Sequence, residues 1–209
     1  MKQRFEEVID NRQRLREIIT GGSGKAAHKE IDHIDSICRR FIDSSPFVLI
    51  ATRGADGFLD ISPKGDPAGF VAVLDEKTLA IPDRLGNNRL DSFENLMVHP
   101  EVGLMFMIPG HGDTLRMSGL GTVVRDTNLQ ERFSIRDRAP NLVLVVTVQE
   151  AFTHCPKAMI RSGLWKPERW PGRSNVPSLA EAMVAHGKLD VSQDRMQKII
   201  DNDTNTRLY

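Results

Sequence analysis

The chain has 209 residues, of which 40% are hydrophobic and 27% are charged, and its 28 basic and 28 acidic residues give no formal net charge. These values suit one folded domain with appendages and exclude a chain that is disordered throughout. Because nucleic-acid binding needs a basic surface, the balanced charge also argues against nucleic acid as a partner.

Apolar residues at helical spacing predict two helices near the N-terminus. The first covers residues 3–19 and ends at Gly21 and Gly22, and the second runs from about residue 26 to residue 42. We therefore predict an N-terminal helical extension over residues 1–44.

From residue 46 onward the sequence changes to short β-branched or aromatic runs that are separated by turn residues. A helix from Arg89 to about His99 and a short helix around 127–137 interrupt these runs. The predicted strands are PFVLIATR, GFLDIS, AGFVAVLD, KTLAIP, EVGLMFMIP, DTLRMSGLGTVVRD and NLVLVVTVQEAF. Residues 46–82 leave no room for the crossover helices of a parallel sheet, so an antiparallel sheet closed into a small barrel is predicted.

The rest of the chain predicts a loop rich in Trp, Pro and Arg, followed by helices near 177–186 and 192–202. We assign residues 45–165 to the barrel domain and residues 166–209 to a C-terminal loop and helices that pack on it. The predicted fold class is α+β, centred on a barrel of six or seven strands.

Three features bear on the cellular compartment. Cys38 and Cys155 lie far apart and fit neither a paired metal site nor a redox motif, so we expect reduced thiols. The N-terminal segment MKQRFEEVID lacks the apolar core of a signal peptide. The run LVLVV at 142–146 is far shorter than the ~18 residues of a membrane span. The sequence therefore predicts a cytoplasmic protein with no membrane partner.

The segment IPDRLGNNRL, residues 81–90, leaves a predicted strand and starts a helix. Asn87 or Asn88 suits the N-cap of that helix, and a helix N-terminus favours a bound anion. The guanidinium groups of Arg84 and Arg89 match phosphate oxygens, and Lys64 in SPKGD adds a further cation. A solvated loop with a good helix cap explains the same residues without any ligand. The GxxxxGK[ST] spacing of a Walker P-loop is absent.

The order of the motifs, SPKGD…GF, then IPDRLGNNRLD…NL, then PG…TLRMSG, resembles that of split-barrel flavoproteins related to pyridoxamine 5′-phosphate oxidase. The resemblance covers about residues 40–165. It implies a six-stranded antiparallel Greek-key split barrel that forms a homodimer, with FMN held at the subunit interface.

The resemblance also implies the residues that bind the phosphate of FMN. Arg84 and Arg89 are expected to contact the phosphate, and Asn87 and Asn88 are expected to supply amide or cap contacts.

The resemblance implies that Ser62, Pro63 and Lys64 lie along the flavin or its ribityl chain. Thr114 and Arg116 fall on the segment that lines the cofactor pocket in relatives, either in the same subunit or from the partner subunit. Strand alternation in TLRMSGLG places Arg116 on the face opposite Leu115 and Met117. An external ligand or plain solvent exposure would explain Arg116 there equally well.

Several other residues are left without an assigned role. His111, Cys155 and Trp165 have chemistry that the motifs do not use, and no metal site is predicted from the spacing of His28, His33 and Cys38. The C-terminal tail contains Arg169 and Arg173. It lacks the paired Arg and His segment with which the true oxidases bind vitamin B6 phosphates.

The resemblance implies an FMN-dependent oxidoreductase that acts on a small-molecule redox substrate of unknown identity. A deazaflavin-dependent reductase on the same barrel is one alternative. A non-catalytic flavin- or haem-binding module is another, with His111 or His154 as the first haem ligands to suspect.

Overall fold

The computed structural model describes residues 4–21, 24, 29–172, 174 and 176–209. It divides into two units, Met1–Glu30 and Ile31–Tyr209, which are treated separately below. Predicted features at Gly22, at residues 26–28, including His28, and at Arg173 lie outside the described residues.

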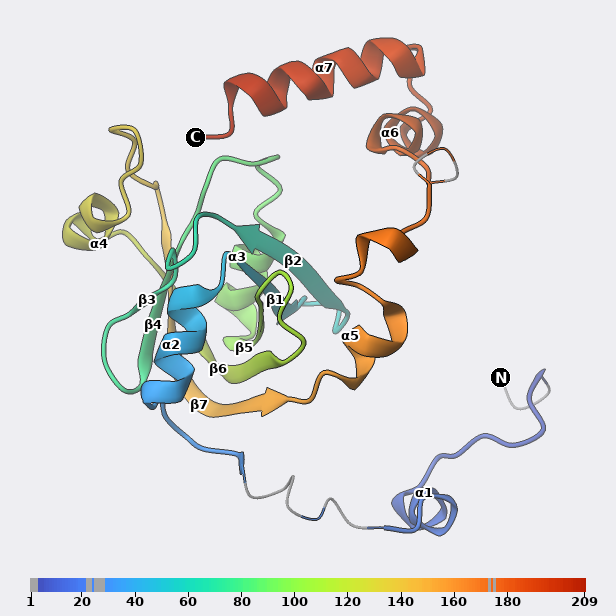
Figure 1. The fold of residues 1–209 in the computed structure, drawn as a ribbon. Coiled ribbons are helices and arrows are strands. Elements are labelled where there is room, and N and C mark those ends of the chain that lie inside the picture. The colour runs from blue at the N-terminus through green and yellow to red at the C-terminus, as the bar shows by residue number, and fades with distance from the viewer. Residues whose placement is uncertain (1–3, 22–23, 25–28, 173, 175) are drawn as a thin grey trace. The chain divides into compact units, whose positions relative to one another are not determined.

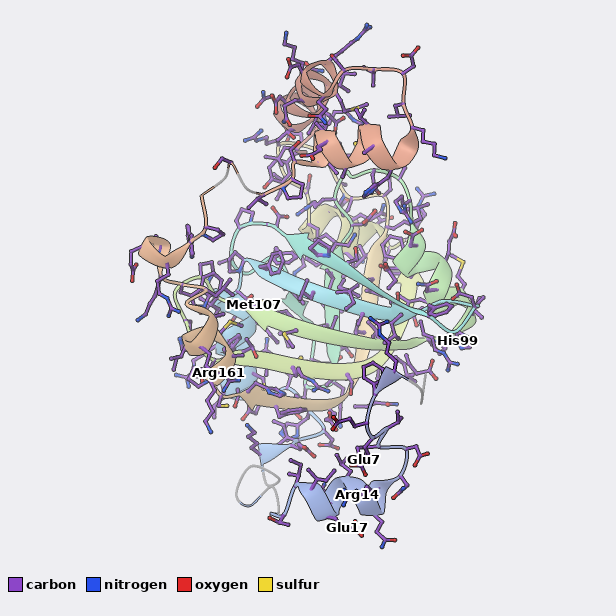
Figure 2. The ribbon with its side chains drawn as sticks, turned by 90° about the vertical axis from the view of Figure 1, so that its right-hand side faces the viewer. Glu7, Arg14, Glu17, His99, Met107 and Arg161 are labelled. Carbon is purple, nitrogen blue, oxygen red and sulfur yellow. The ribbon has the colours of Figure 1, made fainter. Side chains whose placement is uncertain are left out.

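The first unit contains one helix, α1 (Arg12–Ile18), among its described residues. The carboxamide oxygen of Asn11 accepts the backbone N–H of Arg14 at 2.9 Å and so caps the helix. Figure 2 shows Arg14 beside Glu7 and Glu17, with which it forms ion pairs of 2.7 and 3.2 Å. The prediction of one helix over residues 3–19 is therefore wrong in its first half, because the cap at Asn11 starts the helix later.

The second unit begins with an extended segment rather than with a helix. Ile31 exchanges backbone hydrogen bonds of 3.0 and 2.7 Å with Ala151, which draws this segment onto the sheet. Helix α2 (Ser36–Ser44) starts only where the carboxylate of Asp35 accepts the N–H of Cys38 at 2.8 Å. The helix predicted from residue 26 to 42 is thus shorter, because pairing with a distant strand replaces its first part.

One seven-stranded sheet, antiparallel at every pairing, forms the centre of the second unit (Figure 1). The strand order is β2-β1-β5-β6-β7-β4-β3, so β2 and β3 end the sheet. The strands are β1 (Phe47–Arg53), β2 (Leu59–Gly65), β3 (Ala72–Val73), β4 (Thr78–Pro82), β5 (Glu101–Met107), β6 (Thr114–Val124) and β7 (Val143–His154).

The predicted α+β class and antiparallel sheet are confirmed, but the count of six strands implied by the resemblance is not. The predicted strand in AGFVAVLD is present only as the two-residue β3, which pairs with β4 and makes the seventh strand. The Greek-key connection stays a prediction.

Burial alternates along the strands, as expected of a sheet with one face toward a core. Strands β1 and β5 show this most clearly, with every second residue buried. Each fully buried Val, Leu, Ile or Phe contributes about 1.5–3 kcal/mol to stability. The side chains with at most 1% of their surface exposed include Ile42, Val48, Ile50, Leu79, Ile81, Phe106, Leu115 and Leu144.

Strands β6 and β7 change register at Ser118 and Gly119. A Cβ added at Gly119 would lie 2.1 Å from the carbonyl oxygen of Thr147, so only glycine fits this close approach. Such bulges bend a strand and increase its twist, which helps a sheet to curve.

Helix α3 (Asp91–Val98) follows β4, and α4 (Thr127–Arg132) precedes β7. The C-terminal part holds α5 (Lys157–Ser162), a short 3₁₀ helix at Pro167–Arg169, α6 (Leu179–Gly187) and α7 (Gln193–Thr206). The last two confirm the helices predicted near 177–186 and 192–202. Among the described residues, no helix combines the length and the apolar character needed to cross a bilayer.

Candidate functional site

A cleft of about 300 Å³ lies where β2, the loop after β4 and the start of α3 meet. Seven of the nine residues that the sequence assigned to a cofactor line it: Ser62, Pro63, Lys64, Arg84, Asn87, Asn88 and Arg89. Thr114 and Arg116 are not among the lining residues. The two motif segments, about twenty residues apart in the chain, therefore form one site.

The place of β2 at the end of the sheet explains why the cleft is open on one side. Lys64 pairs with Val48 of β1, so its side chain lies on the face of the buried Val48. Among the residues that the structure describes, no further strand lies beyond β2 to cover that side chain. The Lys64 ammonium lies 5.5 Å from the ring centroid of Phe93 on α3, and this cation–π contact stabilises the ammonium group.

The loop before α3 has an unusual backbone. Asn88 and Leu90, which flank Arg89, have φ angles of 58° and 59°. Asparagine tolerates this left-handed region, but a leucine there costs about 1–2 kcal/mol. Such strain persists only where the surrounding structure enforces it, and it gathers at functional sites.

The same loop corrects the predicted helix cap. Leu90 occupies the N-cap position of α3 without a side-chain hydrogen bond, whereas the carboxamide oxygen of Asn87 accepts the N–H of Arg89 at 3.1 Å. The prediction that Asn87 or Asn88 caps α3 is wrong, because the left-handed turn at Asn88 removes the extended backbone that a cap needs. The first turn of α3, whose residues Asp91, Ser92 and Phe93 line the cleft, therefore has no side-chain cap.

Arg89 is the most exposed cation of the cleft. Its Nε lies 2.7 Å from Oδ2 of Asp91, with 72% and 40% of the two side chains exposed. The hydrogen bond that Arg89 donates to Asp91 raises the pKa of Arg89, so the guanidinium stays charged. An exposed pair of this kind contributes little to stability, so Arg89 can leave Asp91 for a stronger anion at little cost.

Arg84, in contrast, is held inside the protein. Its Nε donates to Oδ2 of Asp66 at 2.6 Å and its Nη1 donates to the carbonyl of Phe133 at 2.6 Å. The side chain of Asp66 is only 1% exposed, and that of Arg84 is 17% exposed. Arg84 thus neutralises a buried carboxylate, and we assign it a positioning role rather than direct phosphate binding.

The other oxygen of Asp66 accepts the hydroxyl of Tyr209 at 2.8 Å. Sequence reasoning missed Tyr209, because its partner lies 143 residues away and no motif contains it. The Arg136 guanidinium lies 5.2 Å from the Tyr209 ring, and Arg138 donates to its carbonyl oxygen. The C-terminal segment is therefore anchored next to the candidate site through the carboxylate that orders Arg84.

Tyr209 is the only tyrosine of the chain, so its ionisation can be followed by ultraviolet absorbance. The hydrogen bond that its hydroxyl donates to Asp66 raises its pKa above the ordinary value of about 10. The bond contributes stability below the unfolded pKa, and that contribution is lost as the pH rises through the folded pKa. We expect a higher tyrosine pKa in the folded protein than in the urea-unfolded chain; equal values would show that Tyr209 is not docked on Asp66.

Comparison with known proteins shows to which family the chain belongs. Residues 34–155 match the family model of pyridoxamine 5′-phosphate oxidase, which is more than half of the chain. The chain belongs to the pyridoxamine 5′-phosphate oxidase family. No curated protein sequence matched it significantly.

Solved structures with a similar fold have low sequence identity to this chain. HupZ of Group A Streptococcus is 18% identical and has a TM-score of 0.46, over 57% of this chain and 93% of its own. A Clostridium acetobutylicum protein related to general stress protein 26 is 15% identical, with a TM-score of 0.42 over 56% and 84% of the two chains. The haem storage protein HutZ of Vibrio cholerae is 14% identical, with a TM-score of 0.40 over 58% and 94%. These values are too low to transfer a ligand or a reaction.

In this family member, Arg116 lies on the outer face of the sheet. Strand pairing places it in one row with four residues of neighbouring strands, listed from β2 to β7 as Pro63, Leu49, Met105, Arg116 and Phe152. Its guanidinium lies 5.0 Å from the ring centroid of Phe152. The predicted separation of Arg116 from the buried Leu115 and Met117 is confirmed. Thr114, at the start of β6, is only 6% exposed.

The residues without an assigned role lie away from the cleft. His111 is exposed, with its Nε2 3.6 Å from Oδ2 of Asp113, and Cys155 is exposed as well. The indole nitrogen of Trp165 is buried without a hydrogen-bond partner. Burial raises the pKa of the Cys38 thiol to about 11, which suppresses its reactivity. Within the described part of the chain, no group of three His, Cys, Asp or Glu side chains could hold a metal.

Proposed function

We propose that this chain is an FMN-binding oxidoreductase and that the cleft holds the phosphate and the adjoining ribityl chain of the flavin. The observation that carries the proposal is the meeting of the SPKG segment of β2 with the loop from Arg84 to Arg89 around one polar cleft. Bound FMN would supply the transfer of a hydride or of single electrons. The protein residues would bind and orient it.

Arg89 and Lys64 are the cations that we assign to the phosphate. Arg89 can turn its guanidinium fork from Asp91 to two phosphate oxygens, because the present pair is exposed and weak. Asp91 would then remain in the first turn of α3, where a carboxylate is stabilised by the helix dipole. Lys64 stays 2.9 Å from Oδ1 of Asp83 and offsets that carboxylate, which would otherwise repel the phosphate.

Backbone groups complete the phosphate site. Asp91 and Ser92 both line the cleft and precede the first hydrogen bond of α3, from the N–H of Phe93 to the carbonyl of Leu90. Their N–H groups lie at the positive end of the helix dipole, where phosphates bind in many proteins. The donors present therefore fit a phosphate.

A titration separates this proposal from a general flavin affinity. FMN should bind with one-to-one saturation, seen as quenching of its fluorescence. Riboflavin, which lacks the phosphate, should bind about ten- to a hundredfold more weakly, because it loses a charge-assisted contact. Equal affinity for the two flavins would overturn the phosphate assignment. A Soret band after addition of haem, with no FMN binding, would favour the haem-binding module instead, and tighter binding of a deazaflavin coenzyme would favour the reductase.

The family tail that recognises vitamin B6 phosphates was not found in the sequence, so we do not extend the proposal to that substrate. Of the two tail arginines, the structure describes only Arg169, whose guanidinium lies 3.0 Å from the position of a Cβ added at Gly163. It is not among the residues that line the cleft. We propose a small-molecule redox substrate of another class.

We further propose that the active form is a homodimer joined through the outer face of the sheet. Figure 2 shows β2, β1, β5, β6 and β7 side by side, with Met107 near the end of β5. The outer face of β2 carries Leu59 and Ile61, which are 74% and 63% exposed, and Phe58, which directly precedes the strand, is 77% exposed. Exposed apolar side chains this close together are typical of an interaction surface. Ile61 also lines the cleft, so this interface would reach the cofactor.

An Ile61→Asp substitution should convert the dimer to a monomer, because it would bury an unpaired carboxylate at the interface. Light scattering should change from twice the chain mass of 23.4 kDa to that mass itself. Met97→Asp serves as the control, since Met97 is also an exposed apolar side chain, at 77%, but lies on α3. A wild-type monomer that still binds FMN would show that the dimer is not needed.

A further inference from the structure

We propose that a second cavity, next to the cofactor cleft, binds an apolar organic monoanion such as an aromatic carboxylate or sulfonate. The cavity has a volume of about 540 Å³, within the ~300–1,000 Å³ range of small-molecule sites. The loop after β4, the segment before β7 and Tyr209 enclose it. The inference is independent of what the neighbouring cleft holds.

The two sites share one wall. Asp83, Arg84, Asn88 and Leu90 line both the cleft and the second cavity, so a single loop separates the two. A ligand in the second cavity would therefore contact the loop that carries Arg89. The remaining lining residues are Leu85, Ile135, Arg138, Ala139, Pro140, Asn141, Leu142 and Tyr209.

The apolar character of the ligand follows from the exposed leucines of this wall. Leu85 and Leu90 are 47% and 46% exposed, and together with Ile135, Pro140 and Leu142 they present a largely apolar surface. An apolar ligand would remove this surface from water, at about 25 cal/mol for each Å².

The charge of the ligand follows from the donors that face the cavity. Asp83 is already held by Lys64, and Arg84 is held by Asp66. Arg138 donates one N–H to the carbonyl of Tyr209, and a guanidinium has five N–H donors and no acceptor. Arg138 is exposed, so its remaining donors are open to an acceptor on a ligand, and an anion makes the strongest such partner.

Backbone strain around the cavity supports a built site. Five non-glycine residues of the described chain have positive φ angles, and four of them, Asn88, Leu90, Arg136 and Asp137, lie in the two segments that border this cavity. Arg136 and Asp137 form the centre of a turn that Ile135 and Arg138 close with two backbone hydrogen bonds of 3.0 Å. A left-handed arginine is strained, and strain of this kind concentrates at ligand sites. The strained turn is what holds Arg138 at the cavity.

The test uses anilinonaphthalene sulfonate, an apolar aromatic monoanion whose fluorescence rises when it leaves water. We expect saturable one-to-one binding to the full chain. Arg138→Gln should weaken binding about ten- to a hundredfold, because it removes a charge-assisted contact, and Leu85→Asp should abolish it. FMN affinity should not change in Arg138→Gln, since Arg138 does not line the cleft. That readout also shows that Arg138→Gln is folded. Urea unfolding checks the fold of Leu85→Asp, because Leu85 stands in the loop from Arg84 to Arg89.

Two controls account for binding elsewhere. Arg40→Gln changes an exposed arginine of α2, and Met97→Asp changes an exposed apolar side chain of α3; neither should affect the dye. Absence of saturable dye binding would overturn the proposal. So would dye binding that Arg138→Gln and Leu85→Asp leave unchanged, or that Arg40→Gln weakens equally. A failure of FMN binding with intact dye binding would instead count against the proposed function alone.

Discussion

Replacing Arg84 with alanine should lower the free energy of unfolding by about 3–5 kcal/mol, the range typical of removing one charged side chain from a buried ion pair. The reason is Asp66, whose side chain is 1% exposed and whose Oδ2 would lose the donor 2.6 Å away. The carbonyl of Phe133 would lose its donor as well. Urea unfolding of the variant and of wild type measures the difference directly.

A double variant tests the cause of this loss. Asp66→Asn combined with Arg84→Ala should recover a large part of the lost stability, because no buried charge is then left without a partner. Arg40→Ala, at an exposed position, should change stability by no more than about 0.5 kcal/mol. A loss below about 1 kcal/mol for Arg84→Ala would show that the pair is not buried in solution and would return Arg84 to the list of phosphate ligands.

The second large effect concerns affinity rather than stability. Arg89→Ala should weaken FMN binding about ten- to a hundredfold, since a charge-assisted hydrogen bond is worth about 1.5–3 kcal/mol. Its effect on unfolding should stay within about 0.5 kcal/mol, because the Arg89–Asp91 pair is 72% and 40% exposed. Fluorescence titration and urea unfolding of the same preparation separate the two quantities.

The conservative variant sharpens the test. Arg89→Lys keeps the charge but loses the planar fork, so its affinity should fall between those of wild type and Arg89→Ala. Arg53→Ala, an exposed arginine at the end of β1 that does not line the cleft, should leave affinity unchanged. If Arg89→Ala binds FMN as tightly as wild type, the loop is a solvated helix entry and nothing more.

The contrast between Arg84 and Arg89 shows what the sequence could and could not predict. Both arginines stand in one motif, and the motif correctly places both at one cleft. Their partners decide their roles, however. Asp91 is two residues from Arg89, whereas Asp66 and Phe133 are 18 and 49 residues from Arg84. Only the folded chain brings the latter groups together.

The fold was predicted best where local sequence determines the structure. Strands such as β1 and β5 were predicted from short apolar runs between turn residues, whereas the structure shows which residues of each run are buried. Boundaries were predicted less well where tertiary pairing competes with helix propensity. The pairing of Ile31 with Ala151 delays α2, and the left-handed Leu90 replaces the predicted asparagine cap of α3. Tyr209 had no sequence signal at all, because its role depends on a buried carboxylate far away in the chain.

The central claim is that the cleft between β2 and α3 selects FMN. For the most direct measurement, the purified protein is incubated with an equal mixture of FMN, FAD and haem, and unbound ligand is removed. The protein is then denatured, and the released chromophore is identified by chromatography. The account predicts FMN, bound without a covalent link, because the cleft offers donors for one phosphate and the chain lacks the glycine-rich pyrophosphate motif of dinucleotide sites. Recovery of FAD or haem in place of FMN, or of a flavin attached covalently to the chain, would contradict it.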